Sequence, residues 1–398
     1  MDIKITPARL SGTVQAIASK SLAHRYLICA ALAERETTIE CAETSADIEA
    51  TVHCLSALGA QIARAEGCFY IKPIHEFPTK ATLYCGESGT TLRLLLPLVG
   101  AAGITAEFHM AGRLPERPIA PLCSEMERMG CCLTHTQSNV IRCTGKLKPG
   151  NYQIDGSISS QFISGLLIAM SIMDGQSQLS IAGIPVSTPY VRMTQKVLKE
   201  FGGETKGFSV KGRYPLQSIG HITVEGDWSN SAFFLGAEAL GEDVSVTGLQ
   251  AQSIQGDRVV MELFEQLQHY TTIDLTDNPD LLPILAVVAA CKQGATFSGI
   301  AHLRYKESDR IASVMQLLDA LGVSSDVAGN TFTVFPGPFH GGIVDCFSDH
   351  RIAMSAAIAA TRADSPVTIL GADCVVKSYP SFWEEYRKLG GLYEQYIR

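Results

Sequence analysis

Basic residues in this chain occur beside short runs of Ser, Thr, Gly, Asn and Asp, a combination that suits the binding of anions. Ser19-Lys20-Ser21 is followed by Arg25, and Asp349-His350 is followed by Arg351. Lys and Arg donate charge-assisted hydrogen bonds to carboxylates and phosphates, and Arg can do so in a bidentate geometry. The most concentrated run, residues 304–310, reads Arg-Tyr-Lys-Glu-Ser-Asp-Arg. Taken alone, this run fits a solvated helix face somewhat better than a charged site.

Other segments offer hydrogen-bonding groups with little positive charge. Residues 86–90 (Gly-Glu-Ser-Gly-Thr) look like a phosphate loop but lack the Gly-Lys-Ser/Thr ending of nucleotide-binding loops. They therefore indicate an anion site more than a nucleotide site. Ser159, Ser160 and Gln161 supply three polar side chains where a helix N-cap needs one, which favours an oxyanion or polyol ligand. Asp280 precedes an apolar run, where a carboxylate is either an N-cap or a poised acid or base.

Six such polar runs each open a helix made almost entirely of small and apolar residues. The runs begin at residues 19, 86, 157, 227, 277 and 348, so the intervals are 67, 71, 70, 50 and 71 residues. A helix that is apolar nearly all round is buried, yet its first turn still presents free N–H groups and a positive dipole end. The repeat therefore predicts six buried helices whose heads can hold anions.

A second series of amphipathic helices accompanies the first and supports a repeat of about 70 residues. Five of these helices end in Gly, at residues 59, 130, 202, 322 and 390, where Gly can take a left-handed C-cap. The short interval of 50 residues separates the fourth and fifth heads, and the fourth unit alone lacks this Gly, which suggests a boundary near Gly226. Short runs with strand character lie between the helices: Thr37–Cys41, Ile181–Pro185, Ile222–Glu225 and Val367–Leu370.

Composition limits the classes of function. The 398 residues are enough for two domains. The net charge of −8 (32 basic minus 40 acidic residues) argues against nucleic acid as the main partner. No apolar run reaches the ~20 residues of a membrane span and no signal segment opens the chain, so we expect a cytoplasmic protein without membrane contact. The twelve cysteines, with Cys131 and Cys132 adjacent, suggest buried free thiols rather than disulfides or structural zinc.

Several motifs, taken in order, resemble the 5-enolpyruvylshikimate-3-phosphate synthase family, the target of glyphosate. The resemblance runs from about residue 4 to 390 and touches all six units. Its motifs are Ser19-Lys20-Ser21 with Arg25, Gly89-Thr90, Glu116-Arg117-Pro118-Ile119, Ser159-Ser160-Gln161-Phe162, Lys306-Glu307-Ser308-Asp309-Arg310 and Asp349-His350-Arg351-Ile352-Ala353-Met354. Each motif is weak by itself, but the ordered set is specific.

The resemblance implies an α/β fold with two domains. Each domain is an inside-out α/β barrel made of three βαβαββ repeats around buried parallel helices. One domain is expected to combine residues 1–12 with 227–398, and the other to hold residues 13–226. The active site is expected in the interdomain cleft.

The family's reaction transfers the enolpyruvyl group of phosphoenolpyruvate to the 5-hydroxyl of shikimate 3-phosphate and releases phosphate. It belongs to the shikimate pathway, which leads to chorismate and the aromatic amino acids. The resemblance implies a transferase with these two small molecules as its partners, no metal or organic cofactor, and a monomeric state.

The resemblance also assigns site residues. The shikimate 3-phosphate site falls on Lys20, Ser21, Arg25, Ser159, Ser160, Gln161, Ser187, Tyr190, Asp280 and Lys306. The phosphoenolpyruvate site falls on Lys20, Gly89, Arg117, Gln161, Arg310, Arg351 and Lys377. Asp280 suits the base that accepts the 5-hydroxyl proton, and Glu307 or Lys20 is the candidate acid for the methylene carbon.

Two positions depart from the family's pattern. Glu87 stands where the family usually has Asn, so it must point away from the ligand, pair with a cation or become protonated. His302 stands where some members have a substrate-contacting Asn, and we leave it out of the site. Two alternatives remain: the sister enolpyruvyl transferase acting on UDP-N-acetylglucosamine, and a non-catalytic binding protein of the same fold. The sister enzyme's reactive-cysteine loop has no evident counterpart near residues 113–117.

Overall fold

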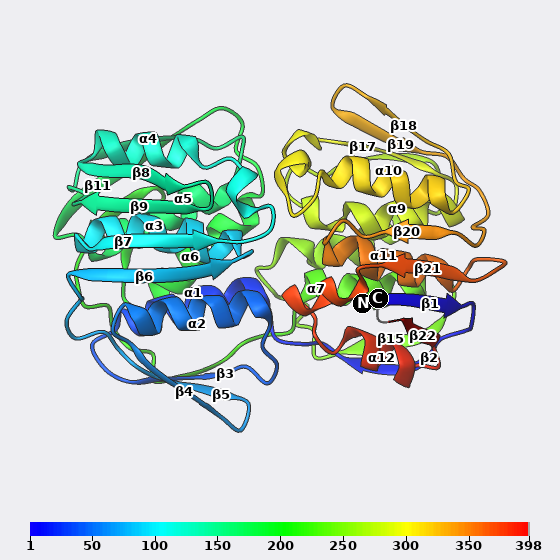
Figure 1. Ribbon diagram of the computed structural model, residues 1–398, viewed down its shortest axis with the longest axis horizontal. Helices are drawn as coiled ribbons and strands as arrows, with labels where there is room; N and C mark the ends of the chain where they lie inside the picture. The colour runs from blue at the N-terminus through cyan, green and yellow to red at the C-terminus, as the bar shows by residue number, and fades with distance from the viewer. Residues whose placement is uncertain (397–398) are drawn as a thin grey trace. The chain divides into compact units, whose positions relative to one another are not determined.

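The chain folds into two compact units, each defined by the contacts among its own residues. A computed structural model describes residues 1–396. We call Ala18–Glu225 the inner unit, and Met1–Ile17 together with Gly226–Arg398 the discontinuous unit. In Figure 1 the inner unit runs from blue to green, and the discontinuous unit combines the first, dark blue strands with the segments from green to red.

The six expected buried helices are all present. In the inner unit they are α1 (Lys20–Ala31), α3 (Gly89–Ala102) and α5 (Ser160–Ile172). In the discontinuous unit they are α7 (Trp228–Ala239), α9 (Leu282–Cys291) and α11 (His350–Ala360). Their polar heads act as caps: Ser88, Ser159, Asp227 and Asp349 each accept a backbone N–H of the first turn. The prediction of six polar-headed, buried helices is confirmed.

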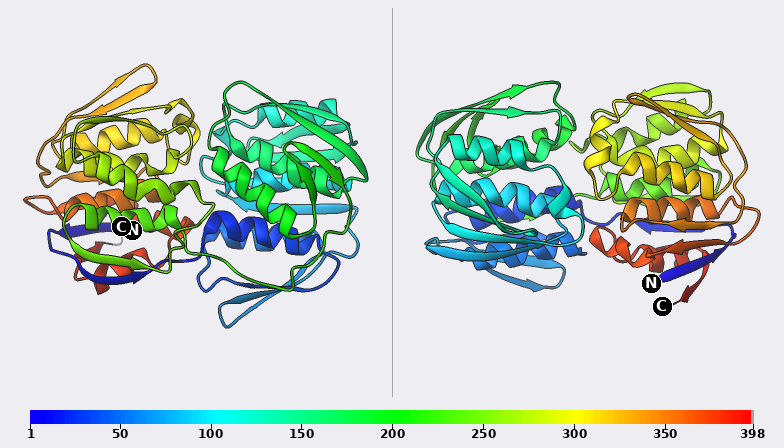
Figure 2. Two further views of the ribbon diagram at one scale, coloured as in Figure 1. Left: turned by 180° about the vertical axis from the view of Figure 1, so that it is seen from behind. Right: turned by 45° about the horizontal axis from the view of Figure 1, so that its top comes forward.

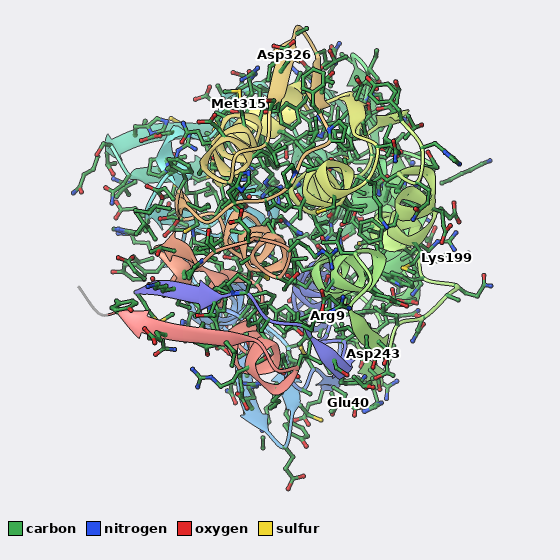
Figure 3. All side chains as sticks on the ribbon, turned by 90° about the vertical axis from the view of Figure 1, so that its right-hand side faces the viewer. Arg9, Glu40, Lys199, Asp243, Met315 and Asp326 are labelled. Atoms are coloured by element: carbon green, nitrogen blue, oxygen red, sulfur yellow. The ribbon has the colours of Figure 1, made fainter. Side chains whose placement is uncertain are left out.

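The second helix series is also present and more exposed. It comprises α2 (Ala46–Ala57), α4 (Ala120–Arg128), α6 (Thr188–Glu200), α8 (Val260–Gln266), α10 (Arg310–Ala320) and α12 (Phe382–Lys388). The glycines predicted to end five of them all have positive φ, as a left-handed C-cap requires. Figure 3 shows the helices of the discontinuous unit end-on, with Met315 of α10 pointing outward.

Three four-stranded sheets surround the helices of the inner unit, in the orders β14-β3-β5-β4, β6-β7-β9-β8 and β10-β11-β13-β12. In each order the first two strands are parallel and the rest antiparallel. Their bounds are β3 (Thr37–Glu40), β4 (Gln61–Ala65), β5 (Cys68–Lys72), β6 (Lys80–Gly86), β7 (Thr105–Met110), β8 (Cys131–Gln137), β9 (Val140–Gly145), β10 (Asn151–Asp155), β11 (Gly175–Ala182), β12 (Glu204–Lys206), β13 (Ser209–Gly212) and β14 (His221–Thr223).

The discontinuous unit has sheets β20-β21-β1-β22 and β16-β17-β19-β18 and the pair β15-β2. Their bounds are β1 (Asp2–Thr6), β2 (Ser11–Gln15), β15 (Asp243–Thr247), β16 (Thr271–Asp274), β17 (Ala295–Ser298), β18 (Ser325–Ala328), β19 (Thr331–Val334), β20 (Ile343–Asp345), β21 (Val367–Leu370) and β22 (Leu392–Tyr396). Within residues 1–396, α8 is followed directly by β16 with no antiparallel hairpin between them, which explains the 50-residue interval. Figure 2 shows the helices of each unit running side by side with strands outside them.

Strands from far away in the sequence complete sheets in both units, as β1 does between β21 and β22. β14, at the end of the inner unit, pairs in parallel with β3 near its start. β2 pairs in parallel with β15, which follows α7. The Ser19 N–H donates to Glu225 O and the Asp227 N–H to Ile17 O, both at 2.8 Å. In each unit, a backbone hydrogen bond therefore joins the two segments that lie next to the unit boundaries.

The mixed α/β fold with repeated βαβ units is confirmed, although the sheets of residues 1–396 are separate and do not close into a hydrogen-bonded barrel. One strand prediction is partly wrong: β11 ends at Ala182, because Gly183, with φ of 70°, turns the chain before Pro185. β3 and β14 also end before Cys41 and Glu225. All twelve cysteines are free, as expected, but only seven of them are buried and Cys132 is exposed. No helix among the described residues is long and apolar enough to cross a membrane.

Candidate functional site

The head of α1 carries a lysine that is held by an acidic partner. Lys20 is the first residue of α1, and its Nζ lies 2.9 Å from Asp47 Oδ2 on α2. Both side chains are largely buried, at 14% and 12% exposure. The ion pair fixes the lysine at the end of the helix where the dipole already favours anions. Asp47 was not among the predicted site residues.

Arg25 is a buried guanidinium whose contacts are all with neutral oxygens. Its Nε donates to Thr194 Oγ1 (2.8 Å), and its two terminal nitrogens donate to the Ser21 and Tyr190 carbonyls (2.6 and 3.0 Å). Burial lowers the pKa of Arg25 to about 10, so it remains charged at neutral pH. No carboxylate among residues 1–396 forms an ion pair with it. A buried positive charge of this kind favours an anionic ligand.

A chain of hydrogen bonds joins α1, α2 and α3 to one another. His24 Nδ1 lies 2.7 Å from Thr51 Oγ1, which lies 2.6 Å from Thr91 Oγ1, and Thr91 donates to Ser88 Oγ (2.8 Å). Burial, with the nearby charge of Lys20, holds the pKa of His24 well below its usual range. His24 is therefore neutral, and it positions the helix heads without adding charge.

Gly89 lies beneath two guanidinium groups. A Cβ at this position would lie 3.0 Å from Arg117 Nη1 and 3.3 Å from Arg93 Nη1, so a side chain here would press on both. Arg93 donates to Gln161 Oε1 (2.9 Å), and Gln161 Nε2 donates to Thr90 Oγ1 (2.9 Å). The structure thus brings the predicted residues Gly89, Arg117 and Gln161 together around Arg93, which the prediction omitted.

The remaining predicted residues of the inner unit stand at the heads of α5 and α6. Ser159 caps α5 through Gln161 N, and Ser160 is buried. Ser187 precedes α6 with φ of 54°, a left-handed conformation uncommon for Ser. Tyr190, in the first turn of α6, contacts Arg25 through its carbonyl. Of these groups, Tyr190 contacts Arg25 directly.

Glu87 lies against the loop after β7. Its carboxylate occupies the space where a Cβ of Gly112 would be, so Gly112 makes room for it. The Glu87 side chain is therefore directed toward that loop.

In the discontinuous unit, Arg310 contacts three carboxylates. It begins α10, and only 1% of its side chain is exposed. It reaches Asp280 and Glu307 at 2.6 Å each and Asp349 at 3.1 Å. The charge run at residues 304–310 is therefore not a solvated helix face. It forms η4 (Ala301–Tyr305) and the N-cap of α10, and it ends on a buried cation.

Asp280 is the common partner of the cations in this cluster. It lies in η3 (Pro279–Leu281), and Arg351 reaches its Oδ2 at 3.1 Å, whereas Lys306 approaches its Oδ1 at 3.8 Å. Burial opposes ionisation of this carboxyl, but the charges of Arg351, Lys306 and Arg310 outweigh burial and hold its pKa well below the usual range. Asp280 is therefore an ionised acceptor at neutral pH.

Asp349 and Lys377 secure the edge of the cluster. Asp349 is fully buried and accepts from Ser308 Oγ (3.0 Å), from Arg310 Nε and from the Arg351 N–H (3.0 Å). Lys377 ends η5 (Ala372–Lys377), and its Nζ donates to the Ser348 carbonyl (2.7 Å). Both residues thus fix the turn that leads into α11.

His302 lies beside this cluster. Its Nε2 is buried and has no hydrogen-bond partner within residues 1–396. Burial, helped by the charge of Lys306, lowers the pKa of His302 to about 3. The imidazole is therefore neutral at physiological pH.

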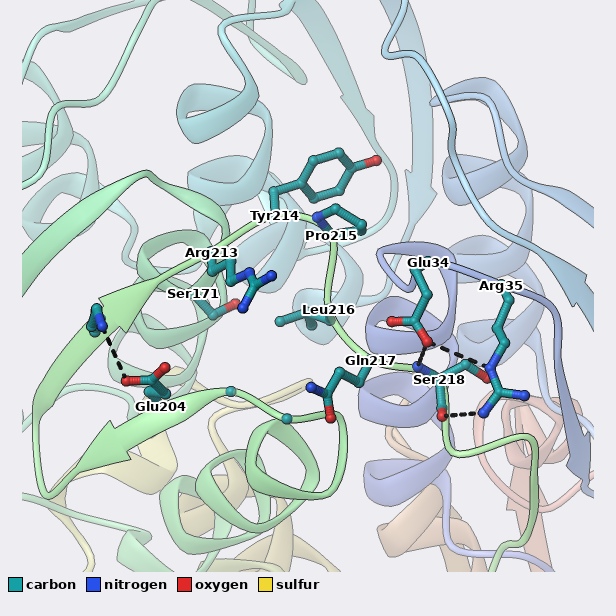
Figure 4. A pocket seen from close by; sticks show the side chains of 13 residues that line it. Glu34, Arg35, Ser171, Glu204, Arg213, Tyr214, Pro215, Leu216, Gln217 and Ser218 are labelled. Atoms are coloured by element: carbon teal, nitrogen blue, oxygen red, sulfur yellow. Dashed lines mark hydrogen bonds and ion pairs between the residues drawn. The ribbon is translucent and has the colours of Figure 1, made fainter.

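A separate polar cavity of about 490 Å³ lies in the inner unit and contains none of the predicted site residues. Figure 4 shows Arg213 and Gln217 within it, with Glu34 and Arg35 on one side and Glu204 on the other. Two surface ion pairs, Glu34–Arg35 at 3.4 Å and Lys211–Glu204 at 3.7 Å, flank it.

The predicted residues therefore form two charged clusters, one within each unit. The inner cluster holds Lys20, Ser21, Arg25, Gly89, Arg117, Ser159, Ser160, Gln161, Ser187 and Tyr190. The other holds Asp280, Lys306, Glu307, Arg310, Arg351 and Lys377. The prediction missed their supporting partners, namely Asp47, Arg93, Asp349 and Ser229, whose Oγ accepts from Arg351 at 2.8 Å. Of these, Asp349 had a sequence signal, because it precedes His350-Arg351 at a predicted helix head.

Known proteins resemble this chain along nearly its full length. A family model described as EPSP synthase (3-phosphoshikimate 1-carboxyvinyltransferase) matches residues 5–386. A 3-phosphoshikimate 1-carboxyvinyltransferase of Clostridium acetobutylicum is 36% identical, and the alignment covers 98% of this chain and 97% of that protein. The enzyme of the same name from Clostridium kluyveri is 34% identical over 99% of this chain and 98% of that protein.

Solved structures share the fold. EPSP synthase from Acinetobacter baumannii matches with a TM-score of 0.80 at 24% identity, covering 99% of this chain and 100% of that chain. The enolpyruvyl transferase NikO from Streptomyces tendae matches with a TM-score of 0.78 at 18% identity, covering 99% and 98%. The family match over residues 5–386, together with 36% identity to a full-length relative, shows that this chain belongs to the EPSP synthase (3-phosphoshikimate 1-carboxyvinyltransferase) family.

Proposed function

We propose that this enzyme transfers the enolpyruvyl group of phosphoenolpyruvate to the 5-hydroxyl of shikimate 3-phosphate and releases phosphate. The observation that carries the proposal is Arg25, a buried guanidinium with only neutral partners. The phosphate of shikimate 3-phosphate supplies the missing negative charge, and the hydroxyls of Ser21, Ser159 and Ser160 suit its remaining oxygens.

Phosphoenolpyruvate carries a carboxylate and a phosphate, and both require cations. We assign it to Lys20, Gly89, Arg117 and Gln161 of the inner cluster and to Arg310, Arg351 and Lys377 of the other. Guanidinium groups bind carboxylates and phosphates through two parallel N–H···O hydrogen bonds, in a bidentate geometry. Gly89 leaves Arg117 room to present its guanidinium, because any side chain there would press on it.

Asp280 is assigned as the base that accepts the 5-hydroxyl proton. Without ligand its cationic neighbours make it a weak base. When phosphoenolpyruvate binds to Arg310 and Arg351, their positive field at Asp280 falls, so the basicity of the carboxylate rises. Binding of phosphoenolpyruvate thus makes Asp280 a stronger base. Asp280 accepts the 5-hydroxyl proton of shikimate 3-phosphate only when phosphoenolpyruvate is also bound.

Glu307 and Lys20 are the candidate acids for the methylene carbon. Protonation there makes C2 electrophilic, the 5-hydroxyl oxygen attacks it, and a tetrahedral intermediate results. Collapse of the intermediate breaks the C2–O bond to phosphate, and the methyl carbon returns a proton to the group that had protonated it, so the enolpyruvyl double bond forms again and phosphate leaves. The developing charge on the leaving group is stabilised by the same lysine and arginine side chains that bound the substrate.

The test is phosphate release from phosphoenolpyruvate, assayed with shikimate 3-phosphate and with UDP-N-acetylglucosamine in parallel. We expect release with shikimate 3-phosphate alone. Release only with the nucleotide sugar would favour the sister transferase, and no release with either would favour a binding protein. Lys20→Ala and Glu307→Ala are expected to lower turnover by roughly 100-fold or more with the fold intact. Lys199→Ala, at an exposed position of α6, is the matched control.

The proposal includes the monomeric state that the family resemblance implies and the cytoplasmic location expected from the sequence. Sedimentation equilibrium with and without both substrates tests the first, and a mass of two chains would contradict it. Cell fractionation tests the second.

A further inference from the structure

Two free thiols of the discontinuous unit lie close together. Cys346 directly follows β20 and is fully buried, whereas Cys374 lies in η5 and is partly exposed. Their Sγ atoms are 3.4 Å apart, and Cys346 Sγ also donates to the Gly371 carbonyl at 3.1 Å. The S–S bond of a disulfide is about 2.05 Å long, so the two sulfurs need to approach by only about 1.4 Å.

This thiol pair lies between two segments that carry site residues. Cys346 is three residues before Asp349, and Cys374 is three residues before Lys377. The segments are already joined by the hydrogen bond from Lys377 Nζ to the Ser348 carbonyl. Phe347 and Ser348 have φ of 51° and 55°, a strained conformation for residues with side chains. Surrounding contacts must hold this turn in place, and the thiols are among them.

We propose that Cys346 and Cys374 are a modification site, at which a small-molecule disulfide such as oxidised glutathione forms a reversible internal disulfide that lowers activity by displacing Lys377. The loss of activity rests on the proposed function, whereas formation of the bond does not.

The chemistry is two thiol–disulfide exchanges. The partly exposed Cys374, as its thiolate, attacks one sulfur of glutathione disulfide and releases one glutathione. Cys346, as its thiolate, then attacks Cys374 Sγ and releases the second glutathione. The two cysteines lose two electrons and two protons, and both are recovered in two glutathione thiols. The hydrogen bond with Cys346 and burial raise the pKa of the Cys374 thiol, so the exchange is faster at alkaline pH.

When the disulfide forms, η5, which carries Cys374, is expected to move more than the segment that carries Cys346. Cys346 is buried and packs against Gly371, where a Cβ would lie only 3.2 Å from its Sγ. Cys374 lies on a short, partly exposed turn, so it has more freedom to move. A shift of about 1 Å in η5 carries Lys377 away from the Ser348 carbonyl, and misplacement on that scale costs up to about 100-fold in rate at a catalytic site. We expect activity to fall by roughly tenfold or more.

The chain offers a matched control. Cys131 and Cys143 form another thiol pair, on the adjacent strands β8 and β9, and the hydrogen bond with Cys131 raises the pKa of the Cys143 thiol. Neither strand contains a predicted site residue. Cys131→Ser is therefore expected to leave both the Cys346–Cys374 bond and the loss of activity unchanged.

The experiment incubates the full-length enzyme with oxidised glutathione at mildly alkaline pH, then maps disulfide-linked peptides by mass spectrometry and measures phosphate release. We expect a peptide joining Cys346 to Cys374, a loss of activity reversed by dithiothreitol, and neither effect in Cys374→Ser or Cys346→Ser. Glutathione retained on Cys374 without the internal bond would overturn the proposal. So would a bond formed with full activity retained, because Lys377 would then be undisturbed. If the reduced enzyme released no phosphate, the proposed function would fail, while the peptide map would still decide whether the thiols join.

Discussion

Removing the Asp349 carboxylate tests how far the charged cluster depends on one buried group. Asp349 caps α11 through the Arg351 N–H and accepts from Arg310 Nε and Ser308 Oγ, with none of its side chain exposed. Loss of an N-cap costs about 1 kcal/mol. A hydrogen bond to a charged group contributes about 1.5–3 kcal/mol, and an orphaned buried hydroxyl costs about 1 kcal/mol. Asp349→Ala should therefore destabilise the discontinuous unit by about 4 kcal/mol.

Asp349→Asn should be milder. Asn is a good N-cap and keeps one oxygen for the Arg351 N–H, so mainly the contact with Arg310 is lost, at about 2 kcal/mol. For a unit of this size, 1 kcal/mol corresponds to about 2–4 °C in Tm. We therefore expect losses of about 8–16 °C for Ala and about half as much for Asn.

Differential scanning calorimetry and urea unfolding measure these changes, and Asp326→Ala on exposed β18 is the control. The reasoning is refuted if Asp349→Ala shifts Tm by less than about 2 °C, or if Asn costs as much as Ala.

Three further predictions follow from single contacts. Gly89→Ala places a Cβ 3.0 Å from Arg117 Nη1, so the KM for phosphoenolpyruvate should rise roughly tenfold with little change for shikimate 3-phosphate; equal changes for both would contradict this. Asp47→Asn removes the charge that holds Lys20 at 2.9 Å, and kcat/KM for phosphate release should fall roughly tenfold. An unchanged kcat/KM would mean that Lys20 is positioned by other contacts. Burial lowers the pKa of His302 from 6.5 to about 3, so the unfolded chain takes up the proton first and stability is lost as pH falls below 6.5. This loss of unfolding free energy should reach about 2 kcal/mol at pH 5. Urea unfolding at pH 7 and pH 5 measures it, and His302→Gln should abolish this contribution. If the variant lost as much unfolding free energy between the two pH values as the parent protein, His302 would be excluded as the source.

The helices were predictable from sequence because their signals are local. A polar cap followed by an apolar run is readable within a dozen residues, and so is a Gly at the end of an amphipathic helix. Strand pairing was not predictable in this way, because β14 meets β3 across nearly the whole inner unit and no local pattern records such a partner. The fourth unit's missing hairpin was visible only as a short interval.

The site shows the same division. Cationic and hydroxyl residues at helix heads were readable, and the family resemblance assigned them roles. The partners that orient them were not, since Asp47 lies on a different helix from Lys20 and looks like an ordinary first-turn acid. The run at residues 304–310 had two interpretations from sequence, and only its ion pairs with Asp280 and Asp349 distinguish them.

The position of β1 has a consequence for how the protein forms during synthesis. β1 and β2 are synthesised before the other described strands, but β15, the partner of β2, follows 232 residues later, and β21 and β22 are the last of the described strands to be made. The inner unit has all its strands once β14 is made, so it can fold while the first seventeen residues still lack their sheet partners. A nascent chain that stops before β22 leaves one edge of β1 uncovered. Such an edge is a template for pairing with another chain, so truncated products should aggregate more readily than the complete protein.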